Sequence, residues 1–197
     1  MHWVLDTALE QSRIWQDEGR NIPVYVNISM YDLRDATFAD LVAERLAVHG
    51  ACPELFGIEV TESAAIADPR RTRSTLERLR TIGVRVAVDD FGTGYSSLAH
   101  LVAMPVDELK IDRSFVVGMS SSPQHAAIVR STVSLGHDLN LTVIAEGVEN
   151  ASAAQQLRLF GCDLIQGYMV SWPLPAAELI ARVDKNSSPI SLPGAAA

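Results

Sequence analysis

The size and composition of the chain fit one globular domain. With 197 residues, 48% of them hydrophobic and 20% charged, the chain is long enough to bury a substantial core. Its net charge of −8 argues against a surface for nucleic acid or an anionic membrane, because both need basic patches. No run approaches the roughly 18 apolar residues that span a bilayer, and the first residues carry no secretion signal. The sequence therefore predicts a cytoplasmic protein without a membrane segment.

The two cysteines do not indicate a metal site or a disulfide. Cys52 and Cys162 stand far apart, with no CxxC spacing and no histidine pair beside them. We therefore expect two reduced thiols.

Apolar periodicity predicts alternating strands and helices. The chain is expected to open inside a helix, because apolar residues recur at helical spacing from residue 4 to residue 15. Six strand-and-helix units are expected to follow. The strands are expected at 22–28, from 55 toward Glu62, at 84–88, 108–111, 141–145 and 164–165. The helices are expected at 38–50, 68–83, 96–103, from 122 through 135, 150–161 and 176–183.

This alternation indicates the fold class. Strands and helices joined by short loops imply right-handed crossovers, and so a parallel sheet or barrel. A (β/α)₈ barrel needs eight strands, of which six are visible, and its chemistry lies at the carboxyl ends of the strands. We expect residues 1–184 to form one α/β domain and the Ser/Pro/Ala-rich residues 185–197 to be a disordered tail.

Two adjacent acids follow the third expected strand. Asp89 and Asp90 stand at its carboxyl end before a glycine-containing loop, and Lys110 lies in the next strand. Paired carboxylates can hold two hard cations that clamp the oxygens of a phosphoryl displacement, and a lysine beside them can orient the water. The alternative is that the two acids only begin a turn and cap a helix.

The longer motifs resemble a known family. DDFGTGYSSL, residues 89–98, and LKIDRSFV, residues 109–116, are similar almost letter for letter to EAL-domain phosphodiesterases, which linearise the bacterial second messenger cyclic di-GMP. Further blocks of the family stand in the same order, namely VYVNIS at 24–29, EVTES at 59–63, AEGVE at 145–149 and QGY at 166–168. The resemblance runs from Trp3 to Leu174.

The resemblance implies a TIM-like (β/α)₈ barrel with one strand reversed. The expected domain is partial, because the part that corresponds to the family's first strand is missing. That strand carries the Glu-Ala-Leu signature, and this tripeptide occurs nowhere in the sequence. In the family the signature glutamate is a metal ligand, so its loss is expected to weaken metal binding and to lower the hydrolysis rate.

The resemblance also assigns roles to individual residues. It implies two Mg²⁺ or Mn²⁺ ions held by Asn27, Glu59, Asp89 and Asp90, with Lys110 and Glu146 as catalytic residues. Gln166 is implied near the nucleotide, and Arg113 could pair with a phosphate oxygen. Glu62 and Glu149 would not hold the metal themselves but would anchor the 89–97 loop, near which the family forms a dimer contact. A homodimer through this loop is therefore an expected assembly.

The implied activity is hydrolysis of cyclic di-GMP to linear pGpG. Three readings stay open from the sequence: an active phosphodiesterase, a domain that binds cyclic di-GMP or a protein partner without cutting it, and an incomplete remnant with exposed sheet edges. A fourth hypothesis is a metal-dependent (β/α)₈ barrel hydrolase that acts on another phosphoester. Such an enzyme would also need the acids, but it would not need the family's motifs in their order.

Overall fold

The computed structural model describes residues 1–66, 68–93 and 98–185. Its centre is a parallel six-stranded sheet in which the strands follow one another in chain order, β1-β2-β3-β4-β5-β6. The strands are β1 (Val24–Ile28), β2 (Phe56–Thr61), β3 (Arg85–Phe91), β4 (Glu108–Ile111), β5 (Thr142–Ala145) and β6 (Leu164–Ile165). Chain-order neighbours and parallel pairing are the pattern of a barrel wall.

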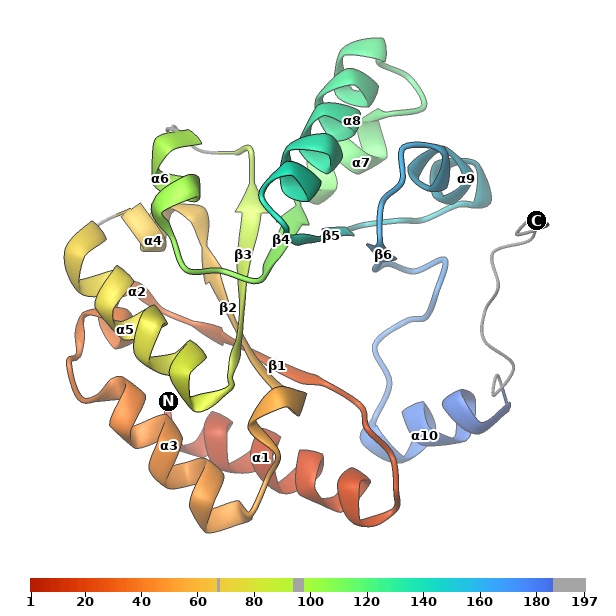
Figure 1. Cartoon of the computed structure of the whole chain (residues 1–197). Helices are drawn as coiled ribbons and strands as arrows, with labels where there is room; N and C mark the ends of the chain where they lie inside the picture. The colour runs from red at the N-terminus through yellow and green to blue at the C-terminus, as the bar shows by residue number, and fades with distance from the viewer. Residues whose placement is uncertain (67, 94–97, 186–197) are drawn as a thin grey trace.

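Helices connect the strands and lie around the sheet, as Figure 1 shows. The longer ones are α1 (His2–Asp17), α3 (Phe38–His49), α5 (Pro69–Ile82), α8 (Pro123–Asp138), α9 (Ala151–Leu159) and α10 (Ala176–Lys185). Short helical segments stand between them: α2 (Met30–Arg34), η1 (Pro53–Leu55), α4 (Glu62–Ile66), α6 (Leu98–Ala103) and α7 (Arg113–Gly118).

Local signals in the sequence explain where the helices begin and end. Asp68 accepts a hydrogen bond from the Arg71 backbone N–H and so caps α5, which Pro69 opens at its first position. Gly83 ends the same helix in a left-handed conformation. Asn150 caps the N-terminus of α9 (Ala151–Leu159) in the same way as Asp68 caps α5. These caps fix the lengths of the crossovers, and with them the places where the next strands start.

The two faces of the sheet differ in chemistry. Because side chains alternate along a strand, every second residue points away from the helices. On the helix side, the strands contribute apolar residues that are almost fully buried, among them Ile58, Val86 and Leu109. A second apolar cluster continues this core under α8 and α9, and it includes Val143 and Ala145. The opposite face of the sheet is mainly polar, and it is the face that carries the candidate site.

The expected elements are present, with differences at their ends. β1 begins at Val24 rather than at residue 22, and β3 extends through both aspartates to Phe91. The chain that follows β2 turns into helix at Glu62, so this residue begins α4 and does not end the strand. The sequence missed the short helices α2, α4 and α7, because five or six residues are too few to show a helical period.

The sheet is an open arc in the described part of the chain. β1 and β6 lie at its two ends and pair on one side only (Figure 1). None of the described helices is long and apolar enough to cross a membrane. The tail expected at residues 185–197 lies outside the described residues, except for Lys185, which ends α10.

Candidate functional site

The site lies on the polar face of the sheet, at the carboxyl ends of the strands. The register pairs Asn27 with Glu59 and Thr61 with Asp89, so side chains from neighbouring strands share this face. Lys110 follows in β4, and Glu146 comes directly after β5. Residues that are far apart in the sequence are thereby brought to one edge, where parallel folds place their ligands.

Lys110 is the centre of this group. Its Nζ lies 2.7 Å from Glu59 Oε2, 2.6 Å from Glu146 Oε1 and 3.3 Å from Asp89 Oδ1. The lysine is only 3% exposed, so the ammonium group is held almost without water. Burial by itself lowers the pKa of Lys110, but the hydrogen bonds to Glu146 and Glu59 outweigh it and raise the pKa above its ordinary value. The lysine is therefore a fixed cation among three carboxylates.

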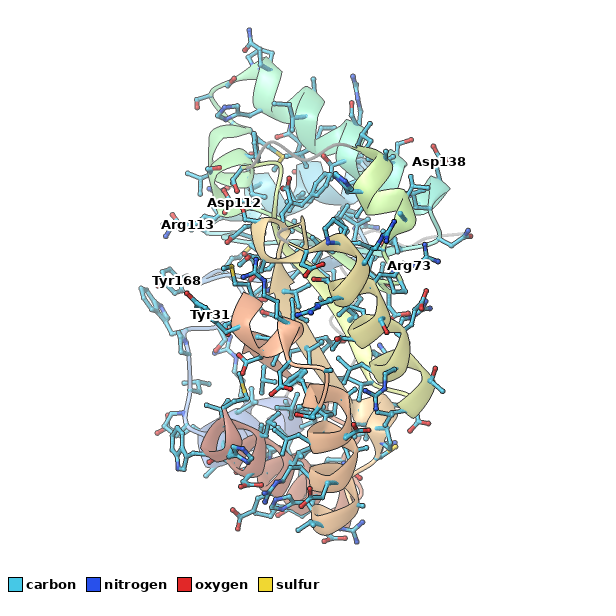
Figure 2. The ribbon with its side chains drawn as sticks, turned by 90° about the vertical axis from the view of Figure 1, so that its left-hand side faces the viewer. Tyr31, Arg73, Asp112, Arg113, Asp138 and Tyr168 are labelled. Carbon is cyan, nitrogen blue, oxygen red and sulfur yellow. The ribbon has the colours of Figure 1, made fainter. Side chains whose placement is uncertain are left out.

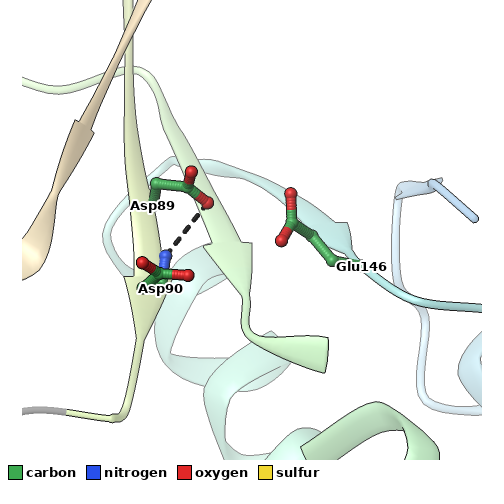
Figure 3. Close-up of side chains that lie close together, drawn as sticks. All are labelled: Asp89, Asp90 and Glu146. Atoms are coloured by element: carbon green, nitrogen blue, oxygen red, sulfur yellow. Dashed lines mark hydrogen bonds between the residues drawn. The ribbon is translucent and has the colours of Figure 1, made fainter. Parts of the chain in front are cut away.

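Asp89 and Asp90 reach the same site through an irregularity in β3. In a regular strand, adjacent side chains would point to opposite faces. Here the pairing of β3 with β4 shifts between Val88 and Phe91, and Asp90 has a positive φ of 55°. Carboxylate oxygens of Asp89, Asp90 and Glu146 consequently lie within 4.8 Å of one another (Figure 3). The sequence showed the two acids but not the bulge that turns both toward Glu146.

This acidic group suits a divalent cation. Three carboxylate oxygens from different parts of the chain converge on one space, and oxygen is the donor that Mg²⁺ and Mn²⁺ prefer. Burial raises the pKa of Asp90, and the neighbouring charges of Asp89 and Asp112 raise it further. A cation between these carboxylates would offset that repulsion. The donor set of Asp89, Asp90 and Glu146 therefore fits a divalent cation, and it contains two of the four expected ligands.

Glu62 contacts the loop that follows β3. Its Oε2 accepts a hydrogen bond from the Gly92 backbone N–H at 2.9 Å, and the residue is 3% exposed. Gly92 has a positive φ of 98°, and a side chain there would meet the Phe115 ring. The predicted contact between Glu62 and the loop is thus present at Gly92. Residues 94–97 of the loop lie outside the described residues, and with them most of the surface expected for a dimer.

Among the described residues, Glu149 pairs with an arginine. Its Oε1 accepts a hydrogen bond from Arg113 Nη2 at 2.6 Å, and both side chains are exposed. This ion pair joins α7 to the loop after β5. Arg113 is thus paired with a carboxylate in this structure, at the rim of the site, where Figure 2 shows it beside Asp112.

Asn27 and Gln166 belong to the two edge strands. Asn27 is exposed on β1, opposite Glu59 in the register. Gln166 directly follows β6, where its backbone N–H donates to the Ala145 carbonyl and its carbonyl accepts from the Val148 N–H. The two residues therefore flank the acidic group from opposite ends of the sheet.

Two cavities adjoin the acidic group. One of about 380 Å³ extends along the polar face, and its lining includes Glu59, Lys110 and Gln166. The other, of about 180 Å³, is lined by Glu146 itself together with Arg113 and Gln166. A larger open hollow of about 680 Å³ lies at the amino-terminal ends of β3 and β4, away from the acidic group. Space for a ligand is thus present beside Lys110 and beside Glu146.

The sequence analysis missed one pair that lies beneath the site. Tyr25 Oη donates a hydrogen bond to Glu108 Oε1 at 2.6 Å, and Glu108 is 4% exposed. Both line the larger of the two cavities that adjoin the acidic group. Glu108 stands two residues before Lys110 and therefore on the same face of β4, which is the signal that could have revealed it.

The chain was compared with known proteins. The match to the family described as EAL domain covers residues 1–173. The chain belongs to the EAL domain family. Its expected fold class is confirmed, because solved EAL domains superimpose closely on its parallel sheet and helices.

Two solved structures illustrate this likeness. The first is described as the MucR phosphodiesterase in complex with c-di-GMP; it is 42% identical, the TM-score is 0.86, and the match covers 90% of this EAL domain and 72% of that chain. The second is the EAL domain of Mycobacterium smegmatis DcpA, which is 40% identical with a TM-score of 0.88 over 93% of this chain and 83% of that chain.

Curated relatives are much longer than this EAL domain. The bifunctional diguanylate cyclase/cyclic di-GMP phosphodiesterase MucR of Pseudomonas aeruginosa is 42% identical over 182 residues, which are 92% of this chain and 27% of MucR. The signaling protein YkoW of Bacillus subtilis is 39% identical over 173 residues, 88% of this chain and 22% of YkoW. The chain thus spans about a quarter of the length of these relatives.

Proposed function

We propose that this EAL domain hydrolyses cyclic di-GMP to linear pGpG. The observation that carries the proposal is the position of Lys110, which lies within 3.3 Å of carboxylates from three different strand ends, beside a group of acids that can hold a divalent cation. Relatives described as cyclic di-GMP phosphodiesterases, and a related structure described as a c-di-GMP complex, support the choice of substrate.

The proposed metal ligands are Asn27, Glu59, Asp89 and Asp90, with Mg²⁺ or Mn²⁺ as the cations. Cations held there would polarise a phosphoryl oxygen and lower the pKa of a bound water. Asp89 and Asp90 would contribute oxygens from the irregular part of β3, and Glu59, which contacts Lys110 in this structure, would contribute one from β2. Calcium is expected to be a poor substitute, because its longer and less regular bonds would alter the spacing of the reacting oxygens.

Lys110 and Glu146 are the proposed catalytic residues. The ammonium group of Lys110 is positively charged and can donate hydrogen bonds, so it can orient the attacking water or stabilise charge on the phosphate. Glu146 holds Lys110 by a 2.6 Å contact and also faces Asp89 and Asp90. In the proposed reaction the water oxygen attacks phosphorus, one bond from phosphorus to a ribose 3′ oxygen breaks, and that oxygen receives a proton.

The remaining predicted residues have supporting roles in this proposal. Gln166 and Arg113 line the smaller cavity beside Glu146 and can contact the nucleotide. Glu62 fixes the start of the loop after β3 through Gly92. Glu149 pairs with Arg113 and would position its guanidinium.

Binding of cyclic di-GMP without hydrolysis is the second candidate function. The observation that favours it is that Lys110 Nζ already lies against Glu59, Asp89 and Glu146, so that the ammonium group takes up carboxylate oxygens that a metal ion would need. A cation or water that is displaced even slightly from the reacting geometry can cost on the order of 100-fold in rate.

One experiment separates these functions. The purified chain is incubated with cyclic di-GMP and Mg²⁺ or Mn²⁺, and products are followed by chromatography, with binding measured in parallel by calorimetry. We expect pGpG to accumulate with the wild type and with Asp138→Ala, which removes an exposed acid on α8, but not with Asp89→Ala. Binding without product would favour the second function, and neither binding nor product from the folded chain would overturn both.

A further inference from the structure

A tyrosine reaches across the polar face of the sheet, below the acidic group. Tyr25 lies on β1 and donates its hydroxyl proton to Glu108 on β4 at 2.6 Å, although β2 and β3 lie between these two strands. In a flat sheet, strands three positions apart are separated by roughly 14 Å, and side chains rise from the sheet almost perpendicularly. A contact between Tyr25 and Glu108 therefore requires the polar face to be concave, so that the two side chains converge.

The two strands that the tyrosine crosses carry small residues next to its two ends. Gly57 on β2 is the register partner of Tyr25, and a Cβ added there would lie 2.3 Å from the ring carbon Cε1. Glycine inside a strand is typical of such a close approach. On β3, the register partner of Glu108 is Ala87, which is fully buried and offers only a methyl group. The strands thus leave the space that the tyrosine side chain needs.

The buried carboxylate of Glu108 depends on this contact. The residue is 4% exposed, and the other group beside its Oε1 is the half-exposed Arg85, whose Nη1 is 3.6 Å away. Burial raises the pKa of Tyr25, and the neighbouring Glu108 raises it further, so the phenol stays protonated and can donate. Because a buried acceptor without its donor is costly, Glu108 holds the Tyr25 side chain across the sheet.

The contact lies one level of side chains below the acidic group. Successive side chains on one face of a strand are two residues apart, which is roughly 7 Å. Asn27 therefore follows Tyr25 on this face of β1, and Lys110 follows Glu108 on β4. At the upper level, Glu59 on β2 contacts Lys110 at 2.7 Å. The curvature that lets Tyr25 meet Glu108 is thus the same curvature that lets Glu59 meet Lys110.

We propose that Tyr25 is a positioning residue for the acidic group, and that its bond to Glu108 is a brace that holds β1 and β2 toward β4. The brace sets the curvature of the sheet, and the curvature sets the distances from Glu59 to Lys110 and to Asp89. This inference rests on the proposed function and adds to it a residue that acts from beneath the site. Loss of the brace changes the spacing of the strand ends, so it affects metal binding and turnover more than nucleotide binding.

The test compares two variants that each lose one buried hydrogen bond. Tyr25→Phe keeps the ring and removes the bond to Glu108. Thr75→Val is the matched control, because it removes the bond from Thr75 Oγ1 to the Leu33 carbonyl, 3.1 Å long and buried between α5 and α2. Mn²⁺ affinity is measured by calorimetry. The kcat and KM for cyclic di-GMP are measured at saturating Mn²⁺, well below the melting temperature of each variant.

We expect Tyr25→Phe to weaken Mn²⁺ binding and to lower kcat, each on the order of 10-fold, with KM within about twofold of wild type. Thr75→Val should leave all three values close to wild type, even where its melting temperature falls as far. Glu108→Gln keeps an oxygen to which Tyr25 can donate, so it should stay closer to wild type than Tyr25→Phe. Gly57→Ala, whose methyl group would displace the Tyr25 ring, should resemble Tyr25→Phe.

Each other outcome decides against one of the two proposals or both. Unchanged Mn²⁺ affinity and kcat in folded Tyr25→Phe would overturn the brace, and so would an equal loss in Thr75→Val, since the effect would then follow from general destabilisation. If Tyr25→Phe does not fold, Gly57→Ala decides in its place. A wild type that binds Mn²⁺ but forms no pGpG contradicts the proposed function, and the Mn²⁺ affinities still test the brace. A wild type that does not bind Mn²⁺ overturns both.

Discussion

Lys110 Nζ and Glu146 Oε1 lie 2.6 Å apart, and they come from the neighbouring strand ends of β4 and β5. The same ammonium group contacts Glu59 and Asp89, so one cation separates three carboxylates that have little access to water. The arrangement depends on charge balance, because buried like charges repel strongly when no cation lies between them. Several measurable consequences follow from this balance and from the geometry around it.

Lys110→Met should lower the free energy of unfolding by about 3 kcal/mol, because it leaves Glu59, Asp89 and Glu146 without their shared cation. Mn²⁺ should raise the melting temperature of this variant more than that of the wild type, since a metal ion can take over part of the charge balance. Thermal unfolding with and without Mn²⁺ measures both effects. Arg73→Met, which removes an exposed cation paired with Glu77 on α5, should change stability by less than about 0.5 kcal/mol. Equal stability of both variants would contradict this account.

Glu62→Ala should loosen the start of the loop after β3, because the Gly92 N–H loses its charged acceptor. The expected cost is about 1 to 3 kcal/mol in the free energy of unfolding, together with faster proteolysis near Gly92. Glu62→Gln keeps a carbonyl oxygen in the same place and should stay closer to wild type. Limited proteolysis followed by mass spectrometry locates the cuts. If both variants are cleaved like wild type, the contact does not order the loop.

Gly167→Ala should destabilise the fold by about 3 kcal/mol, because its Cβ would meet backbone atoms of Val148 at 2.3 and 2.4 Å. Backbone atoms in that position can yield only by displacing the loop that carries Glu146. Gly19→Ala is the comparison, since Gly19 also has a positive φ but has no atom within 4 Å of an added Cβ. Its cost should be about 1 kcal/mol, from backbone strain alone. Urea unfolding of the two variants measures the difference.

Burial raises the pKa of the Cys162 thiol to about 11. At pH 8 its thiolate fraction is then roughly 100-fold smaller than that of a thiol with a pKa of 9, so alkylation by iodoacetamide should be slow. The rate should rise about tenfold per pH unit toward pH 11. The folded chain favours the neutral form of the Cys162 thiol. The stability that this preference contributes is present below the ordinary pKa of a thiol and is lost as the pH rises through about 11. In a Cys52→Ser variant, alkylation reports on Cys162 alone. Fast alkylation of this folded variant at pH 8 would contradict the prediction.

The sequence by itself determined the fold class, the order of the elements and the family. Caps such as Asp68 and Asn150, glycines at helix ends and apolar strands are local features, and local features can be read from neighbouring residues. The ordered motifs also named Lys110 and the acids around it. The roles of these residues stay predictions.

Only the tertiary structure decided how these residues meet. The bulge in β3 brings Asp89 and Asp90 to one side, the register between strands places three carboxylates around Lys110, and Glu149 pairs with Arg113. The Tyr25–Glu108 pair likewise follows from distances in space. Such contacts depend on strand register and on small changes in backbone angles, and a period of hydrophobic residues carries no information about either.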